Sequence, residues 1–268
     1  MILNIQQLIE DKASKDGYEN EIAVTQIKSL KTTINVTYKQ LFKLVNNTSN
    51  HLKKLNIKNK DIIYISSKDS LNFIITFLGA IKVGIIPVPG NPELDIKQKK
   101  QIIENSNPKL IIDDDEKKFG QIQHIKTKKW QNILLENITT PNKFYKPKNN
   151  TPAFIIYSSG TTSIPKGIVH THLSIQNTTY LHKKILKIQP NEKIYTTSKL
   201  FFAYALGNNF FAPFLLGINS IFNDCSIAIK ITNIIRDYKP SCIFSVPTMY
   251  RRILRNKKEN HKYFKKVK

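Results

Sequence analysis

The chain has 268 residues, of which 40% are hydrophobic and 23% charged. This ordinary balance predicts a globular core and excludes disorder along the whole chain. Lysine and arginine number 42 against 19 acidic residues, so the net charge is +23, which could attract nucleic acid or an anionic membrane surface. However, the lysines are scattered from Lys12 to Lys268 among many Asn and Ile residues, which favours compositional drift as the source of the charge.

Cysteine usage and the first residues bear on the cellular compartment. Cys225 and Cys242 form no CxxC pair and have no metal-ligand spacing, so free thiols in a reducing compartment are expected. The start, MILNIQQLIEDKASKDG, lacks the basic and apolar segments of a signal peptide. The longest apolar run, residues 73–89, is interrupted by Lys82 and is too broken for a membrane span. A cytoplasmic location is therefore expected.

A regular alternation of apolar segments begins at residue 61. Residues 61–66 (DIIYIS) are predicted to form a buried strand, and residues 70–83 have the apolar spacing of a helix. A second strand is predicted over 85–88, a charged helix over 93–105 and a third strand over 109–112. Strands that alternate with helices predict βαβ units. The expected fold is therefore α/β, with mostly parallel sheets flanked by helices.

The next stretch, residues 117–150, is rich in lysine and asparagine and contains the lone Trp130. It is predicted to be a peripheral excursion from the core. Residues 151–157 (TPAFIIY) are predicted to form a further strand, because a continuous apolar run is typical of strands buried on both faces. This strand leads directly into the sharpest motif of the chain.

That motif covers residues 157–167 (YSSGTTSIPKG) and combines glycines, hydroxyl side chains and one lysine. Glycine lets backbone N–H groups approach phosphate oxygens, hydroxyls donate hydrogen bonds, and lysine supplies a point charge. An ordinary Ser/Thr/Gly loop is the alternative. That alternative explains neither the apolar strand that feeds the loop nor the Pro-Lys-Gly that closes it.

The motif is not a Walker phosphate loop, whose pattern is G-x-x-x-x-G-K-[ST]. Counting from Gly160, Pro165 stands where the second glycine belongs. Gly167 stands where Ser or Thr is required.

The motif resembles instead the phosphate loop of the adenylate-forming (AMP-binding) superfamily, Tyr-Thr/Ser-Ser-Gly-Thr/Ser-Thr-Gly-x-Pro-Lys-Gly, and departs from it at Ser163. Four further segments resemble that superfamily in order and spacing: 37–41 (TYKQL), 77–89 (FLGAIKVGIIPVP), 199–208 (KLFFAYALGN) and 245–250 (SVPTMY). Segment 199–208 is most similar to the benzoate–CoA ligase branch. The matches cover nearly the whole chain.

The resemblance implies that residues 1–268 are a truncated large N-terminal AMP-binding domain, without the C-terminal mobile domain. The implied reaction is ATP-dependent activation of an aryl or acyl carboxylic acid to an acyl-adenylate, followed by transfer to CoA. ATP, Mg²⁺ and CoA are the implied cofactors. No catalytic residue is assigned within the chain, because the family's principal lysine would lie beyond residue 268.

The resemblance also implies the binding residues. The expected nucleotide contacts are Ser158, Ser159, Gly160, Thr161, Thr162, Lys166 and Gly167. Thr161 and Thr162 would contact the β- and γ-phosphates. The expected acid pocket comprises Phe202, Tyr204, Ala205 and Gly207. His170 and His172 form an H-x-H pair, but no third ligand follows nearby, so no metal site is predicted.

Two other classes of function remain open. The chain could be a truncated, non-catalytic relative of such a ligase, with no acid-dependent pyrophosphate exchange. It could also be a basic binding module whose affinity for nucleic acid falls steeply with salt. On the favoured hypothesis the partners are a small carboxylic acid, ATP and CoA, with no specific nucleic acid and no membrane span.

Overall fold

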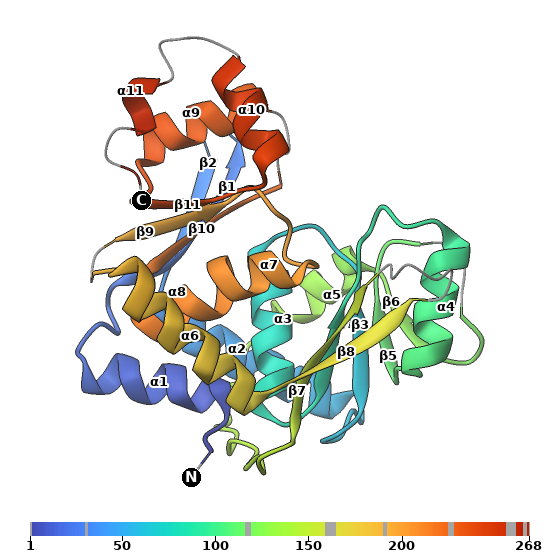
Figure 1. Cartoon of the computed structure of the whole chain (residues 1–268). Helices are drawn as coiled ribbons and strands as arrows, with labels where there is room; N and C mark the ends of the chain where they lie inside the picture. Colours follow the sequence, from blue (N-terminus) through green and yellow to red (C-terminus); the bar gives the residue numbers. More distant parts are fainter. Residues whose placement is uncertain are drawn as a thin grey trace. The chain divides into compact units, whose positions relative to one another are not determined.

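The computed structural model describes residues 2–29, 32–115, 119–158, 165–189, 192–224, 228–255, 261–264 and 267 (Figure 1). The chain divides into two compact units. The first comprises Met1–Asp11 and Gln40–Gln176, and the second comprises Lys12–Lys39 and Asn177–Lys268. Three helices contain the points at which the chain passes between units: α1 (Ile5–Lys15), α2 (Tyr38–Lys54) and α6 (His172–Leu186).

A parallel four-stranded sheet organises the first unit, in the order β4-β3-β5-β6. Its strands are β4 (Ile86–Pro89), β3 (Ile62–Ile65), β5 (Leu110–Ile112) and β6 (Gln123–Ile125), and its helices are α3 (Leu71–Lys82), α4 (Ile96–Ser106) and α5 (Thr127–Ile133). β3, β4 and β5 are almost entirely buried, as continuous apolar runs require. The predicted βαβ pattern is confirmed.

Helix boundaries in this unit follow from capping side chains. The Ser70 hydroxyl accepts a hydrogen bond from the Phe73 N–H and starts α3. Asp95 and Gln98 form a capping box that starts α4 at Ile96, three residues later than the charge pattern predicted. Asn107 then ends α4 in the left-handed conformation.

The lysine- and asparagine-rich segment is not peripheral, and that prediction was wrong. It contains β6, which pairs with β5, and it contains α5. Trp130 of α5 is only 2% exposed, and its indole N–H donates to the Thr76 hydroxyl at 2.8 Å. A buried indole with a satisfied N–H fixes α5 against α3, so the segment belongs to the core of the unit.

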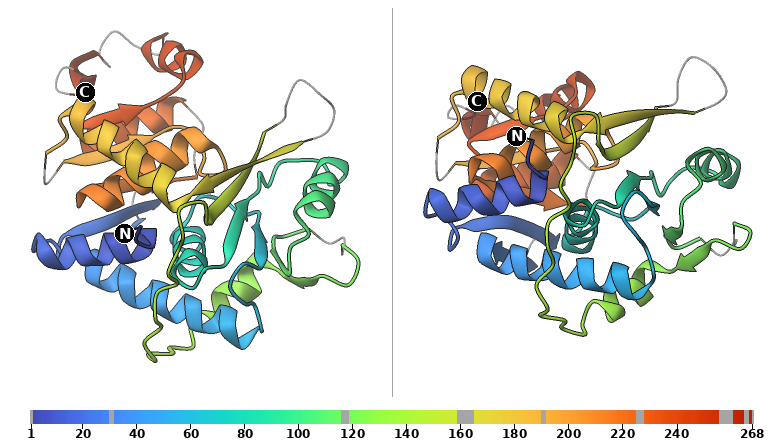
Figure 2. Two further views of the ribbon diagram at one scale, coloured as in Figure 1. Left: turned by 60° about the horizontal axis from the view of Figure 1, so that its bottom comes forward. Right: turned by 90° about the horizontal axis from the view of Figure 1, so that it is seen from below.

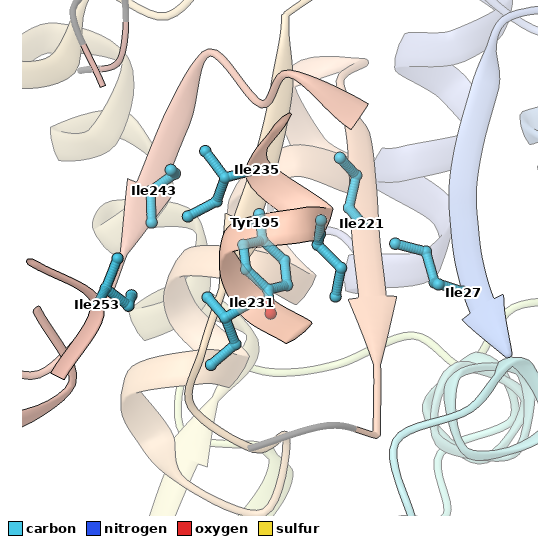
Figure 3. Packing of buried hydrophobic residues seen from close by; sticks show 8 residues of the cluster. Ile27, Tyr195, Ile221, Ile231, Ile235, Ile243 and Ile253 are labelled. Atoms are coloured by element: carbon cyan, nitrogen blue, oxygen red, sulfur yellow. The ribbon is translucent and has the colours of Figure 1, made fainter. Parts of the chain in front are cut away.

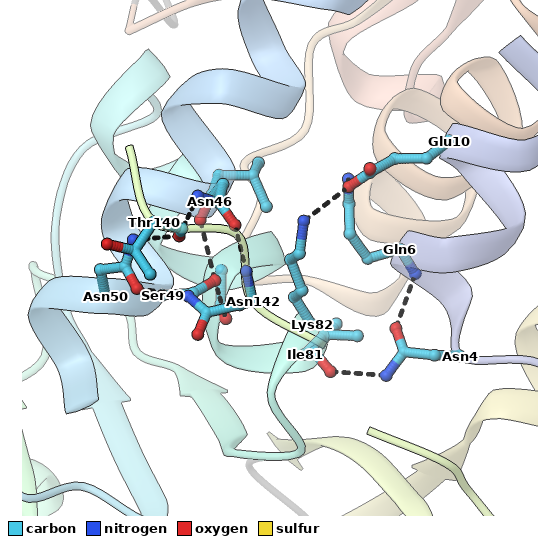
Figure 4. A network of polar contacts seen from close by, with 12 residues as sticks. Asn4, Gln6, Glu10, Asn46, Ser49, Asn50, Ile81, Lys82, Thr140 and Asn142 are labelled. Atoms are coloured by element: carbon cyan, nitrogen blue, oxygen red, sulfur yellow. Dashed lines mark hydrogen bonds and ion pairs between the residues drawn. The ribbon is translucent and has the colours of Figure 1, made fainter. Parts of the chain in front are cut away.

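Asparagine side chains on α2 hold the end of the same segment (Figure 4). The Asn46 amide donates to the Thr140 carbonyl at 2.9 Å, and the Asn142 amide donates to the Asn50 side chain at 2.7 Å. The buried Lys82 ammonium forms an ion pair with Glu10 at 3.1 Å. Side-chain amides both donate and accept hydrogen bonds. They can therefore pair with the backbone N–H and C=O groups of a segment that forms no regular structure.

The second unit is built on a five-stranded sheet with the order β11-β9-β10-β1-β2. Its strands are β11 (Cys242–Phe244), β9 (Lys193–Thr196), β10 (Asn219–Asn223), β1 (Ile22–Ser29) and β2 (Thr32–Thr37). Only the edge pair β1–β2 is antiparallel. The helices of this unit are α7 (Ala203–Ala205), the π-helix η1 (Leu206–Phe211), α8 (Ala212–Leu216), α9 (Ala228–Tyr238), α10 (Pro247–Arg255) and α11 (His261–Phe264).

Isoleucine dominates the core of the second unit (Figure 3). Side chains from β1, β9, β10 and β11 meet α9 and α10 in one cluster: Ile27, Tyr195, Ile221, Ile231, Ile234, Ile235, Ile243 and Ile253. The isoleucines that could reflect drift therefore carry the packing, because β-branched side chains suit the pleated sheet. Cys242 is buried and forms no disulfide within the described part of the chain, whereas Cys225 lies outside it.

Among the described residues, no helix is both long enough and apolar enough to cross a bilayer.

Candidate functional site

The strand that feeds the phosphate-binding motif is β7 (Pro152–Ser158), and its antiparallel partner is β8 (Lys166–Thr171). Figure 2 shows the pair as a narrow two-stranded ribbon. Ser158 pairs directly with Lys166, and the Lys166 side chain is exposed. A hydroxyl and a lysine therefore flank the segment that joins the strands. Four predicted contacts in that segment lie outside the described residues: Ser159, Gly160, Thr161 and Thr162.

The end of this hairpin nearest the connecting segment is fixed to α4. The Tyr157 hydroxyl donates to the Asn105 side-chain oxygen at 2.5 Å. Burial raises the pKa of Tyr157, so the hydroxyl keeps its proton for this bond. A β-carbon at Gly167 would lie 3.1 Å from the Tyr157 ring, so glycine permits this close approach. Gly167, which was predicted to contact the nucleotide, therefore also allows the two strands of the hairpin to pack closely.

His170 and His172 face different partners. The His170 ring stacks on Phe154 with centroids 4.5 Å apart and planes 5° apart. His172 is 1% exposed, and its Nδ1 accepts a hydrogen bond from the Ile5 N–H at 3.2 Å. Burial lowers the pKa of both, to about 4 for His172. Within the described ranges no group of three His, Cys, Asp or Glu side chains could hold a metal ion.

The four residues predicted to form the acid pocket lie on one short stretch of the second unit. Phe202 and Tyr204 are 53% and 44% exposed, whereas Ala205 is fully buried. Gly207 lies in η1, with nothing within 4 Å of the place a β-carbon would take. π-Helical turns are rare and are often found at functional sites. The backbone irregularity therefore coincides with the segment singled out in the sequence.

A cluster of side chains that sequence reasoning missed surrounds Tyr204. Its ring lies edge-on to Phe244 of β11, with centroids 6.2 Å apart. His182 of α6 lies 6.2 Å from the same Phe244 ring, and its Nε2 is 2.5 Å from the Asn208 side-chain oxygen. The Asn208 amide donates to the Tyr204 carbonyl at 2.8 Å. The bond from Asn208 to Tyr204 joins residues four apart. Local spacing does not indicate the contacts of His182 and Phe244, because α6 and β11 lie far from this segment in sequence.

Comparison with known sequences decides the family. The family of AMP-binding enzymes matches residues 10–268. The chain belongs to this family. The matched range contains the β7–β8 hairpin, the residues around Tyr204 and the strands of both larger sheets. The resemblance seen in separate motifs therefore extends over residues 10–268.

Curated relatives of this AMP-binding chain include two aryl-acid ligases. A 4-hydroxybenzoate–CoA/benzoate–CoA ligase of Rhodopseudomonas palustris is 28% identical over 82% of the chain and 44% of its own length. A benzoate–CoA ligase of Thauera aromatica is 27% identical over 82% of the chain and 45% of its own length. The AMP-binding chain thus spans about half the length of the curated relatives that it matches.

Solved structures confirm the fold of the AMP-binding chain. A benzoate CoA ligase from Burkholderia xenovorans has a TM-score of 0.82 at 24% identity, over 94% of this chain and 52% of its own. MatB from Rhodopseudomonas palustris, solved with ATP bound, has a TM-score of 0.86 at 16% identity, over 98% of this chain and 54% of its own. The expected α/β architecture with parallel sheets flanked by helices is confirmed.

Proposed function

We propose that residues 1–268 form part of the large adenylation domain of an ATP-dependent acid–CoA ligase. The reaction is activation of a carboxylic acid to an acyl-adenylate, with release of pyrophosphate, followed by transfer of the acyl group to CoA. The observation that supports it best is the β7–β8 hairpin, which places Ser158 and Lys166 opposite each other at the phosphate motif. Names of the aryl-acid ligases above favour an aromatic acid as substrate.

The physical task of this hairpin is to hold a triphosphate while an acid oxygen attacks its α-phosphorus. Lys166 supplies positive charge, Ser158 supplies a hydroxyl, and Thr161 and Thr162 are assigned to the β- and γ-phosphates. Preorganised donors of this kind stabilise charge that develops on the leaving pyrophosphate. The hydrogen bond between Tyr157 and Asn105 keeps the loop end of the hairpin in place while the nucleotide binds.

Mg²⁺ fits this proposal as a companion of the nucleotide. The ion commonly binds through substrate phosphates and one or two carboxylates while it retains several waters. Mg²⁺ would therefore be held in large part by the triphosphate. When bound, it would neutralise phosphate charge.

In the acid pocket, Phe202, Tyr204, Ala205 and Gly207 would surround the ring or chain of the acid. The exposed faces of Phe202 and Tyr204 offer apolar and aromatic contact, and the missing side chain at Gly207 leaves room. Offset or edge-on contact with an aromatic acid would suit Tyr204, which already lies edge-on to Phe244.

Replacing Lys166 with alanine is expected to weaken ATP binding about tenfold, because a charge-assisted hydrogen bond contributes about 1.5 kcal/mol. Isothermal titration of the purified chain with Mg-ATP measures this effect. Lys183→Ala, on the exposed face of α6, removes the same charge elsewhere and should leave the affinity within a factor of about two. Equal affinities for both variants would remove Lys166 from the nucleotide site and, with it, the main support for the proposed function.

A further inference from the structure

A cavity of about 150 Å³ opens in the first unit at the carboxyl ends of β3 and β5, where it touches Ile65 and Ile112. From β3 the chain runs through α3 to β4 on one side, and from β5 it runs to β6 on the other. The connections that leave β3 and β5 therefore run in opposite directions across the sheet. Such a switch point is where open α/β sheets commonly bind ligands, in the crevice beyond the carboxyl ends of the strands.

The walls of this cavity are apolar and partly aromatic. Ile65, Ile112, Phe73 and Trp130 line it. Because the Trp130 N–H is already bonded to Thr76, the indole contributes apolar surface to the cavity. The volume is below the range typical of drug-sized ligands, so the space suits a small ring compound better than a nucleotide.

Polar groups line the same cavity: Ser67, Lys68, Ser70, Asn72, Asp114, Thr127 and Gln131. The Asp114 carboxylate already has partners at the start of α5. It accepts hydrogen bonds from the N–H and the hydroxyl of Thr127 at 3.1 and 2.6 Å. Lys68 is exposed and brings positive charge. The first turn of α3, which includes Asn72 and Phe73, contains no acidic residue.

We propose that this cavity, the switch-point cavity, binds a small aromatic monocarboxylate. The ring lies against Phe73 and Trp130, and the carboxylate lies toward Lys68 and the hydroxyl of Ser67. Inorganic phosphate is a poorer match, because its greater charge would meet the Asp114 carboxylate and the apolar walls would leave its oxygens unpaired. The inference does not depend on the proposed reaction, since no described residue of β7 or β8 lines this cavity.

Trp130 makes a direct test possible, because it is the single tryptophan of the chain and lines the cavity. Benzoate is the probe, titrated into the full chain while tryptophan emission is followed with excitation at the red edge of the absorption band. A saturable change in emission is expected. Lys68→Ala should weaken benzoate binding about threefold to fivefold, the contribution of an exposed charge pair. Lys97→Ala, an exposed lysine on α4, is the matched control and should leave the curve unchanged.

A second cavity variant, a second ligand and a variant of the acid pocket separate the possible outcomes. Ser67→Leu fills the cavity and should abolish the response, and inorganic phosphate should produce none. Tyr204→Ala should keep the response, because Tyr204 belongs to the other candidate pocket. An unsaturable response, or one that survives Ser67→Leu, would mean adventitious binding only and would overturn the proposal. A response to phosphate as strong as that to benzoate would overturn the ligand class, and loss of the response in Tyr204→Ala would move the site to the acid pocket.

Discussion

Gly84→Ala is expected to destabilise the first unit by about 2–4 kcal/mol. Gly84 follows α3 with φ of 79°, a conformation that an alanine adopts only with strain. A β-carbon there would also lie 2.5 Å from Cγ of Tyr145, whose N–H donates to the Lys82 carbonyl and so closes the segment over the end of α3. The backbone and the tyrosine ring cannot both keep their positions. Denaturant unfolding followed by the emission of Trp130, which lies in the first unit, measures this loss of stability.

A matched glycine separates the two causes of that loss. Gly120 also has a positive φ, 63°, but no atom of the described residues lies within 4 Å of the β-carbon position. Gly120→Ala should therefore cost only about 1 kcal/mol, the backbone contribution. In the double variant Gly84→Ala/Tyr145→Ala the clash is absent, so its cost should be well below the sum of the two single changes. If Gly84→Ala costs no more than Gly120→Ala, the packing of Tyr145 over Gly84 is wrong.

Stability is also expected to fall in mild acid because of His172. Burial lowers its pKa from 6.5 in the unfolded chain to about 4 in the folded chain. Between these values the unfolded state takes up a proton that the folded state refuses, so acidification favours unfolding. At about 1.4 kcal/mol for each pH unit in this window, the loss amounts to about 3 kcal/mol at most. Above pH 6.5 the contribution of His172 should be constant.

Denaturant unfolding at a series of pH values, with and without His172→Asn, isolates this contribution. Asparagine still offers an oxygen to the Ile5 N–H but does not titrate, so the variant should lose stability less steeply between pH 6.5 and 4. His170 titrates in both proteins, and its effect cancels in the comparison. Parallel curves for the two proteins would show that His172 is protonated equally in the folded and unfolded chains.

Local sequence patterns predicted much of the first unit. The strands β3, β4 and β5 were found because buried parallel strands are continuous apolar runs. β7 was found from the same kind of run, although it pairs antiparallel with β8 and is only partly buried. Apolar spacing placed α3, and the charged residues placed α4, within a few residues of the observed ends. The phosphate motif was found in the same way, since its glycines, hydroxyls and lysine are contiguous. Its Ser163 lies outside the described residues, so the departure from the family pattern has no structural account.

Composition was a poorer guide. The abundance of asparagine and isoleucine did not indicate which of these residues matter, yet Asn46 and Asn50 hold a long irregular segment to α2, and isoleucines fill the core of the second sheet. Trp130 was assigned to a peripheral excursion because its neighbours are lysines. A polar neighbourhood in sequence does not fix burial, since helix α5 turns the tryptophan inward and its lysines outward.

The sequence by itself determined the family, the alternation of strands and helices, and the residues of the phosphate motif, because each of these depends on neighbours along the chain. Only the tertiary structure brought His182 and Phe244 to the segment that contains Tyr204, and only it formed the switch-point cavity from β3, α3, β5 and α5. Those contacts join segments far apart in sequence. They depend on which strands pair and in what order, and no local spacing encodes that choice.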